Sequence, residues 1–449
     1  MKEDFLHYLW RLARFDLRDL RTTEGEALTI QQFGVHNHHA GPDFDDARLT
    51  IGGIRWAGRV EMHLRSSDWY LHGHQDDPAY DAVILHVVLE EDRPVFRRDG
   101  TRVPCLELRG RIPAGIRNTY WRLLHNERWV PCAGLLDGVP ASVRAVWLQR
   151  VLAERLEARA DAFMERWHGA DRDWEAAFFQ LLARGMGGKV NGDALEMLAR
   201  SLPLRVLQKH KHSLLQLEAL LFGQSGLLPA PEADEDPYLV RLRREYALLR
   251  VKYDLQPLPA TGWRFLRMRP HNFPTLRIAQ LACLYHRSGQ FFGKALAAAD
   301  VRELRNMFEV SLSNYWREHY RFGSGTTRGE RRLGDATVRS LLINTVATAL
   351  IAYGRHRGEE RWRERALDIL SALPAEENTV LRGWRKAGWP AADAGESQAL
   401  LELKANYCTA TRCTECAVGC HILNRRNGDP DDAPLLTVNE EAVVYALTG

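Results

Sequence analysis

The chain has 449 residues, of which 45% are hydrophobic and 27% charged, so it is long enough for two or three globular domains with their own cores. No run of residues is expected to be long and apolar enough to span a bilayer, and residues 1–5 lack the pattern of a secretory signal. Seven cysteines, four of them clustered near the C-terminus, favour a reducing cytoplasm over a disulfide scaffold.

Charge is unevenly distributed along a chain whose net charge is only +3. The segment from His36 to Asp92 contains 11 acidic and 4 basic residues, so the rest of the chain is clearly basic. An acidic pocket beside a basic body suits a metal-assisted site that acts on a polyanion. Ordinary scatter of surface charge explains the same numbers and stays open as the alternative.

A helix and the first strands of a sheet are predicted at the N-terminus. Residues 3–20 carry apolar side chains at roughly helical spacing. Further on, Gly52-Gly53 separates two short runs with strand character, which is a strong signal for a two-residue hairpin turn. We therefore expect residues 47–51 and 54–56 to pair as antiparallel strands.

The hairpin leads into an alternating run over residues 59–64, which predicts a strand. Glu61 and His63 would share one face of that strand, while the apolar side chains between them point to the other face. Residues 82–89 form a nearly continuous apolar run, as expected for a strand buried on both faces, and residues 103–108 are expected to add another strand. These patterns predict an α+β or α/β domain.

The chain becomes helical from about residue 115. Ten segments show helical periodicity, with glycine and proline between them, and no internal repeat is found. We predict a mixed α/β domain at residues 1–114, a large all-α domain at 115–405, and a metal-binding tail with a cysteine cluster at 406–449. The ten segments are residues 143–167, 172–183, 192–200, 203–222, 236–254, 275–287, 300–319, 335–354, 359–373 and 395–405.

A Pro42-Asp43 pair precedes the predicted hairpin, and Glu61-x-His63 lies on the strand that follows it. This order resembles the PD-(D/E)XK nuclease superfamily, whose members carry Pro-Asp, a hairpin of variable length, and then Asp/Glu-x-Lys on the next strand. The resemblance covers roughly residues 20–110. It implies a restriction-endonuclease-like mixed sheet, with Asp43, Glu61 and His63 as the catalytic residues.

His63 stands where the superfamily has lysine, which leaves its role open. A neutral imidazole can accept a proton or bind a transition metal, and the change is also compatible with loss of nuclease activity. The carboxylates of Asp43 and Glu61 would bind Mg²⁺ or Mn²⁺, and such an ion polarises a phosphate and lowers the pKa of bound water. Either Glu24 or Glu26 would add a third carboxylate.

Seven of the 17 histidines lie between residues 36 and 86, close in sequence to the two carboxylates. His38, His72 and His74 are therefore candidates for further metal ligands. A single histidine is more often a surface or core residue than a ligand, so each of the three keeps that alternative. His86, on the buried strand, is expected to be a hydrogen-bonded core residue.

Four cysteines lie within 13 residues near the C-terminus, spaced Cys408-x4-Cys413-x2-Cys416-x3-Cys420. In a cytosolic protein this density is a strong signal for a metal site, and close thiolates suit either tetrahedral Zn²⁺ or an iron–sulfur cluster. The arrangement is similar to the C-terminal cysteine clusters of DNA-repair glycosylases and some nucleases, which hold a 4Fe–4S cluster with different spacing. This similarity favours iron–sulfur, with zinc as the alternative, in a structural role.

An arginine-rich loop in the helical region is a candidate for contact with nucleic acid. Arg267, Arg269 and Arg277 flank two prolines that fix an extended loop ahead of a helix, and their guanidinium groups could hold phosphate. The same arginines would serve equally as salt-bridge partners between helices. Residues 314–320 form an aromatic and basic stretch, for which helix packing is favoured over base stacking.

Together these motifs resemble a bacterial family of unknown function over nearly the whole chain. The shared features are the Gly-Pro-Asp-Phe turn, the Glu-x-His strand, the Arg-Pro loop and the terminal cysteines. The sequence predicts a cytoplasmic, divalent-metal-dependent nuclease that acts on DNA or RNA and has no membrane partner. Two alternatives stay open: a non-catalytic nucleic-acid-binding or scaffold protein with a structural metal cluster, and a metal-dependent enzyme that uses its histidines on a small molecule.

Overall fold

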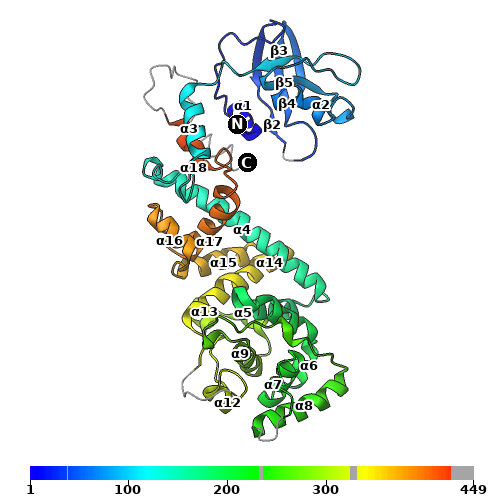
Figure 1. Ribbon diagram of the computed structural model, residues 1–449, viewed down its shortest axis with the longest axis vertical. Coiled ribbons are helices and arrows are strands. Elements are labelled where there is room, and N and C mark those ends of the chain that lie inside the picture. The colour runs from blue at the N-terminus through cyan, green and yellow to red at the C-terminus, as the bar shows by residue number, and fades with distance from the viewer. Residues whose placement is uncertain (38, 232–235, 324–330, 426–449) are drawn as a thin grey trace. The chain divides into compact units, whose positions relative to one another are not determined.

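A computed structural model of the chain divides into two compact units (Figure 1). This division differs from the three predicted parts, because the cysteine-rich tail belongs to the N-terminal unit, where α18 packs on α3. The structure describes residues 1–37, 39–231, 236–323 and 331–425. The first unit consists of Met1–Val151, Glu377–Pro390 and the residues from Ala399, and the second consists of Leu152–Glu376 and Ala391–Gln398.

The first unit contains a six-stranded mixed sheet in the order β1-β3-β4-β5-β6, with β2 paired to β3. Strand β3 is antiparallel to both β1 and β4, whereas β5 is parallel to β4 and β6 is parallel to β5. The predicted mixed sheet is therefore confirmed. The strands are β1 (Leu28–Gln32), β2 (Val35–His36), β3 (Phe44–Ile51), β4 (Ile54–Arg65), β5 (Val83–Glu90) and β6 (Cys105–Glu107).

Glycines fix two critical points of this sheet. Gly52 and Gly53 form the predicted turn between β3 and β4, with φ values of 57° and 87° that glycine adopts without steric cost. Gly58 lets β4 and β5 approach, because a Cβ at this position would lie 2.5 Å from Ile84 Cγ2 and 2.7 Å from the Ala82 carbonyl oxygen. Strand β4 is thus held at the centre of the sheet, between β3 and β5.

Short helices flank the sheet, and both α1 and α2 pack against β4. The first helix ends at Arg11 rather than at residue 20, because the chain turns at Ala13, which has a φ of 50°. The helices confined to this unit are α1 (Glu3–Arg11), α2 (Asp68–Leu71), α3 (Ala114–Leu124), α16 (Thr379–Lys386) and α18 (Ala417–Asn424), and the wide helical turn η6 (Leu403–Cys408) precedes the cysteine segment.

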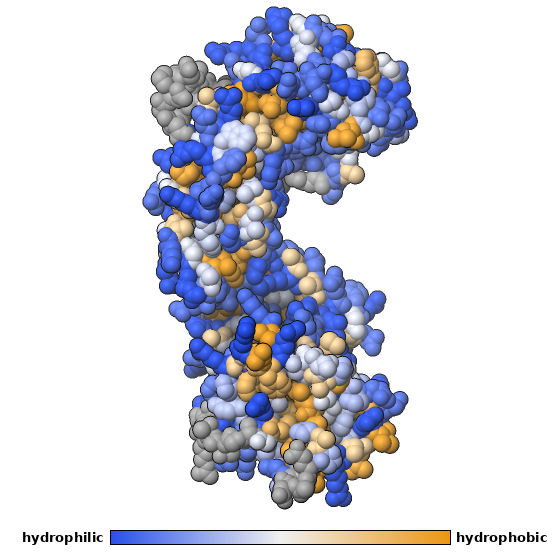
Figure 2. Space-filling model, in the orientation of Figure 1, coloured by the Kyte–Doolittle hydropathy of each residue, from blue (hydrophilic) through white to orange (hydrophobic). Residues whose placement is uncertain are grey.

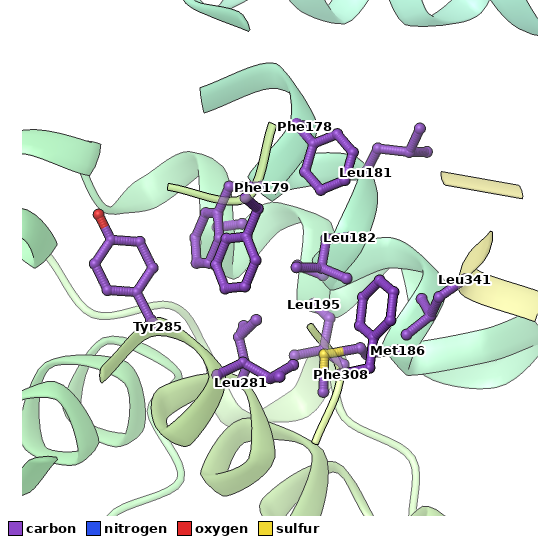
Figure 3. Packing of buried hydrophobic residues seen from close by; sticks show 14 of the residues in the cluster. Phe178, Phe179, Leu181, Leu182, Met186, Leu195, Leu281, Tyr285, Phe308 and Leu341 are labelled. Atoms are coloured by element: carbon purple, nitrogen blue, oxygen red, sulfur yellow. The ribbon is translucent and has the colours of Figure 1, made fainter. Parts of the chain in front are cut away.

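The second unit is mostly helical over its described residues, as predicted for this part of the chain. Helix α5 is the centre of its apolar core, where Phe179 and Leu182 pack near Leu281 and Tyr285 of α9 (Figure 3). Two predicted helices, at residues 172–183 and 192–200, merge into α5 with a kink at Gly188 and Asn191.

The helices of the second unit follow one another closely along the chain. They are α5 (Trp174–Ser201), α6 (Leu204–Lys209), α7 (Leu214–Gln224), α8 (Pro237–Tyr253), α9 (Pro274–Arg287), α10 (Phe291–Ala297), α11 (Val301–Asn306), α12 (Asn314–Glu318), α13 (Asp335–Leu341), η5 (Leu342–Ala347), α14 (Thr348–Arg357) and α15 (Glu360–Ala372). The chain passes between the units at four points, two of which lie within α4 (Ala141–Gly169) and α17 (Ala394–Glu402), while the other two follow Glu376 and Pro390.

Apolar side chains are largely turned inward in both units, and the surface in Figure 2 is mainly hydrophilic with scattered apolar patches. Among the described residues, one helical stretch, Asp335–Arg357, is long and apolar enough by composition to cross a membrane, contrary to the expectation from the sequence. Of its apolar window, 67% is buried inside the protein. A buried core helix meets the same criterion, so this stretch is weak evidence for a membrane span.

Candidate metal centre

Acidic and imidazole side chains from several elements of the first unit meet around β4. Glu61 and His63 lie on this strand, as their alternation predicted, and both are buried, with exposures of 5% and 1%. Side chains from a helix, a loop and the neighbouring strands converge on them. The whole group is Glu3 and His7 of α1, Asp43 directly before β3, Glu61 and His63 of β4, His72 and His74 after α2, and His86 of β5.

Two reciprocal backbone hydrogen bonds hold Asp43 and Glu61 side by side. The Asp43 N–H donates to Glu61 Oε2 at 3.1 Å, and the Met62 N–H donates to Asp43 Oδ2 at 2.9 Å. His7 Nε2 lies 3.2 Å from the same oxygen of Asp43. The two carboxyl groups are therefore held near each other, and the charge of Asp43 acts on Glu61.

Two imidazoles lie at the second oxygen of Glu61, and a third lies against one of them. His74 Nε2 lies 3.3 Å and His63 Nε2 3.6 Å from Glu61 Oε1, and His72 Nδ1 is 3.0 Å from His63 Nε2. One ring nitrogen from each histidine lies within 4.8 Å of the other two. Gly73, with a φ of 77°, reverses the chain between His72 and His74 so that both rings reach the centre.

His86 supports the centre from inside the sheet. Its Nε2 lies 2.8 Å from His63 Nδ1, and its side chain is fully buried, in line with the expected hydrogen-bonded core residue. A proton on His63 Nδ1 that is directed at His86 leaves the Nε2 lone pair facing Glu61 and His72. Such support behind a ligand fixes both the tautomer and the orientation of its ring.

Burial and like charges shape the ionisation of this group. Burial, followed by the charge of Asp43, raises the pKa of Glu61 to about 9. Burial, followed by His74 and His72, lowers the pKa of His63 to about 3, and burial with His63 lowers the pKa of His86 well below its usual value. His63 and His86 are therefore in the neutral form, which is the form of imidazole that binds metals, and Glu61 needs a nearby cation to be ionised at neutral pH.

Helix α1 contributes two further groups that were not anticipated. Burial lowers the pKa of His7, but the interactions with Asp43, Asp4 and Glu3 outweigh it and raise the pKa overall. The pKa of Glu3 is also raised, first by burial and then by Asp43. The spacing of Glu3 and His7, four residues apart on one face of an amphipathic helix, is the signal that could have identified them.

The structure places the other predicted ligands elsewhere or leaves them undescribed. His38 lies outside the described residues. Glu24 pairs with Arg102 at 2.8 Å, and Glu26 is exposed next to the turn at Gly52, so neither supplies the third carboxylate. The third carboxyl group near Asp43 belongs instead to Glu3, because α1 packs against β4 whereas the loop before β1 does not reach the centre.

The three predicted phosphate-binding arginines, all in the second unit, have different environments. Arg267 and Arg269 are exposed in the loop before α9. Arg277 is buried, donates to Gln280 at 2.9 Å and to Asn272 at 2.8 Å, and has its pKa lowered to about 10 by burial. Arg277 is thus used inside the unit, and only the other two present free surface for a ligand.

The four predicted cysteines lie together in the first unit. Cys408 ends η6, Cys413 lies in the following loop, Cys416 precedes α18, and Cys420 lies within that helix. All four are free thiols in the structure.

Residues 3–379 match the model of a family described as a protein of unknown function, DUF2851. The matched range includes every residue of the metal centre and ends before the C-terminal cysteines. No curated protein and no solved structure matches the chain, and the comparisons give no support of their own to the PD-(D/E)XK resemblance. Because the match covers most of the chain, this protein belongs to the DUF2851 family of proteins of unknown function.

Proposed function

We propose that this protein is a divalent-metal-dependent nuclease that hydrolyses phosphodiester bonds in DNA or RNA. The observation that carries the proposal is the pair of backbone hydrogen bonds that locks Asp43 beside Glu61, with the ring nitrogens of His63 and His74 within 3.6 Å of Glu61. A bound divalent ion would polarise the phosphate and lower the pKa of an attacking water. The chain's own residues supply the ligands and their orientation.

The order of the elements supports the resemblance to restriction-endonuclease-like nucleases. Helix α1 precedes three antiparallel strands, β1, β3 and β4, and α2 then leads into β5, which is parallel to β4. Asp43 lies at the start of the middle strand of the three, and Glu61 lies on the next strand. These are the places at which the superfamily pattern carries its two metal-binding carboxylates.

The donor set points to a transition metal rather than Mg²⁺. Three imidazole nitrogens and a carboxylate oxygen suit Mn²⁺ or Zn²⁺, whereas Mg²⁺ prefers oxygen ligands and retains several waters. His63 therefore acts as a ligand in this proposal. It is a poor proton acceptor, since both of its nitrogens face other histidines and its pKa is lowered to about 3.

His7 is better suited than His63 to move a proton at this site. Its side chain is 19% exposed, its Nε2 lies 3.2 Å from Asp43, and the acidic groups around it raise its pKa. A base with a pKa near neutrality is effective at physiological pH. We assign His7 to proton transfer beside Asp43. The exposed Arg267 and Arg269 in the second unit remain predicted contacts for nucleic acid.

The test is cleavage of labelled single- and double-stranded DNA and RNA with Mg²⁺, Mn²⁺, Zn²⁺ or no added ion. Asp43→Asn and Glu61→Gln should each reduce cleavage by at least about 100-fold, because ligands and their supports govern metal affinity and activity. Glu24→Gln is the matched control, since it removes a carboxylate of the same unit that lies away from the centre. Its cleavage rate should equal that of the wild type.

Equal activity in all three variants would refute the assignment of the site. Metal binding with nucleic-acid binding but no cleavage would favour the non-catalytic alternative. The nitrogen-rich ligand set also favours a second candidate, an enzyme acting on a small phosphodiester. Hydrolysis of bis-p-nitrophenyl phosphate that depends on Glu61, without cleavage of any nucleic acid, would support that candidate instead.

A further inference from the structure

A fifth cysteine, distant in sequence, lies beside the C-terminal cysteines. Cys132 belongs to the segment after α3, and its thiol is close enough to Cys408, Cys413 and Cys416 for their charges to interact. Each of the six pairs among these four thiols interacts in this way. The sequence indicated a four-cysteine set, but the structure makes Cys132 a member of it.

The fold brings these segments together through packing on both sides of Cys132. Helix α3 packs on α18, and Trp147 of α4 contacts the ring of Tyr407 edge-on at a centroid distance of 5.2 Å. Cys132, Cys413 and Cys416 are each buried to 8% exposure, so their sulfurs face the interior that these contacts enclose. The four thiols therefore lie in a packed part of the first unit.

Cys420, which the sequence placed in the cluster, also lies close enough to Cys413 and Cys416 for their charges to interact, but its thiol is bonded differently. It is fully buried within α18, and its Sγ donates to the Thr414 carbonyl at 3.2 Å, which uses its proton inside the protein. Burial raises the pKa of the Cys416 thiol to about 11, and hydrogen bonds from the N–H groups of Gly419 and Val418 oppose this shift without cancelling it. A Cβ at Gly419 would lie 2.1 Å from the Cys413 carbonyl oxygen, so this tight turn requires glycine.

The separation of the sulfurs distinguishes between the two kinds of metal site. Four thiolates on one tetrahedral zinc ion lie roughly 3.8 Å apart, given Zn–S bonds of about 2.3 Å. Among the described residues, no three cysteine sulfurs all lie within 4.8 Å of one another. An iron–sulfur cluster spreads its thiolate ligands over several iron atoms, and the Cys408-x4-Cys413-x2-Cys416 spacing is that of plant-type clusters with a remote fourth cysteine.

We infer that Cys132, Cys408, Cys413 and Cys416 bind an iron–sulfur cluster and that Cys420 is not a ligand. The inference does not rest on the proposed nuclease activity, since its residues are distinct from those of the metal centre. It explains why two segments nearly 300 residues apart in sequence bring four thiols, three of them buried, close to one another. Four cysteine ligands leave no iron position for a substrate, and the hydrogen bonds between this segment and the N-terminal helix favour a structural role for the cluster.

The cluster also secures the helix that contributes to the metal centre. Lys2 Nζ donates to Thr411 Oγ1 at 3.1 Å, Tyr8 donates to Asn424 Oδ1 at 2.8 Å, and Arg11 donates to the Thr414 carbonyl at 3.2 Å. All three partners belong to the segment that carries the cysteines. Loss of the cluster should therefore loosen α1, which bears Glu3 and His7.

The experiment compares Cys132→Ser with Cys420→Ser in the full chain, produced and purified without oxygen. Wild type and Cys420→Ser should contain about two or about four iron atoms per chain with equal sulfide, and absorb broadly in the visible range. Cys132→Ser should contain neither above background. Both positions are buried in the same unit, so each variant controls for the loss of a buried thiol in the other.

A measurement on the wild type avoids any folding defect of the variants. Oxidative removal of the cluster should make Cys132, Cys408, Cys413 and Cys416 reactive to alkylation together, and should accelerate hydrogen exchange in α1 but not in β5. Stoichiometric zinc without iron, or metal-free protein after anaerobic reconstitution, would overturn the inference. Loss of iron in Cys420→Ser with retention in Cys132→Ser would overturn the ligand assignment.

Discussion

Replacement of Glu61 by glutamine should stabilise the protein in the absence of a divalent ion. The buried carboxyl has its pKa raised from 4.5 to about 9 in the folded state. Between these values the unfolded chain has released a proton that the folded protein retains, so the free energy of unfolding falls as pH rises through this window. Glutamine has the same shape, accepts the hydrogen bond from the Asp43 N–H and does not ionise.

The size of the effect follows from the width of the window. Each pKa unit corresponds to about 1.4 kcal/mol, so three units between pH 4.5 and 7.5 give an upper limit of about 4 kcal/mol in favour of Glu61→Gln. Below about pH 4.5 the carboxyl is protonated in both states, and the two proteins should have the same stability. Added Mn²⁺ should reverse the order, because it stabilises the wild type through ionised Glu61 and has lost this ligand in the variant.

The assay is thermal and urea unfolding of chelator-treated protein at several pH values, with hydrogen exchange in β4 as a local readout. Glu24→Gln serves as the control, since its exposed ion pair should give a small difference that changes little with pH. A Glu61→Gln variant that is no more stable than the wild type at pH 7.5 would refute the reasoning. A gain of equal size at pH 4 would refute it as well.

Two further predictions concern the neighbourhood of this residue. The His7 imidazole should titrate above its usual pKa of 6.5 in an NMR pH series, so its contribution to stability is complete below pH 6.5 and is lost as the pH rises through the folded-state pKa. The variant Asp43→Asn should lower the pKa of His7, and an unchanged pKa would exclude the contact between the two side chains. Gly58→Ala should destabilise the first unit by about 1–3 kcal/mol through its clash with Ile84, whereas Gly110→Ala, which meets no atom within 4 Å, should be nearly neutral in denaturant unfolding.

Several elements could be predicted from the sequence because they depend on neighbouring residues. Alternation along residues 59–64 placed Glu61 and His63 on one face of a strand, and β4 bears this out. The long apolar run became β5, buried on both faces. The predicted ends of helices were less accurate. The N-terminal helix ends at Arg11 because Ala13 adopts a left-handed backbone conformation, which cannot be predicted from an alanine side chain.

The sequence by itself determined local backbone form: the Gly52-Gly53 turn, the strand carrying the two site residues, and the presence of a thiol-rich segment. Only the tertiary structure decided which side chains meet. His7 joins Asp43 because α1 packs on β4, and Cys132 joins the C-terminal thiols because α3 packs on α18. Turn and strand patterns arise from the dihedral preferences of adjacent residues, whereas these meetings depend on long-range packing between surfaces that no short pattern encodes.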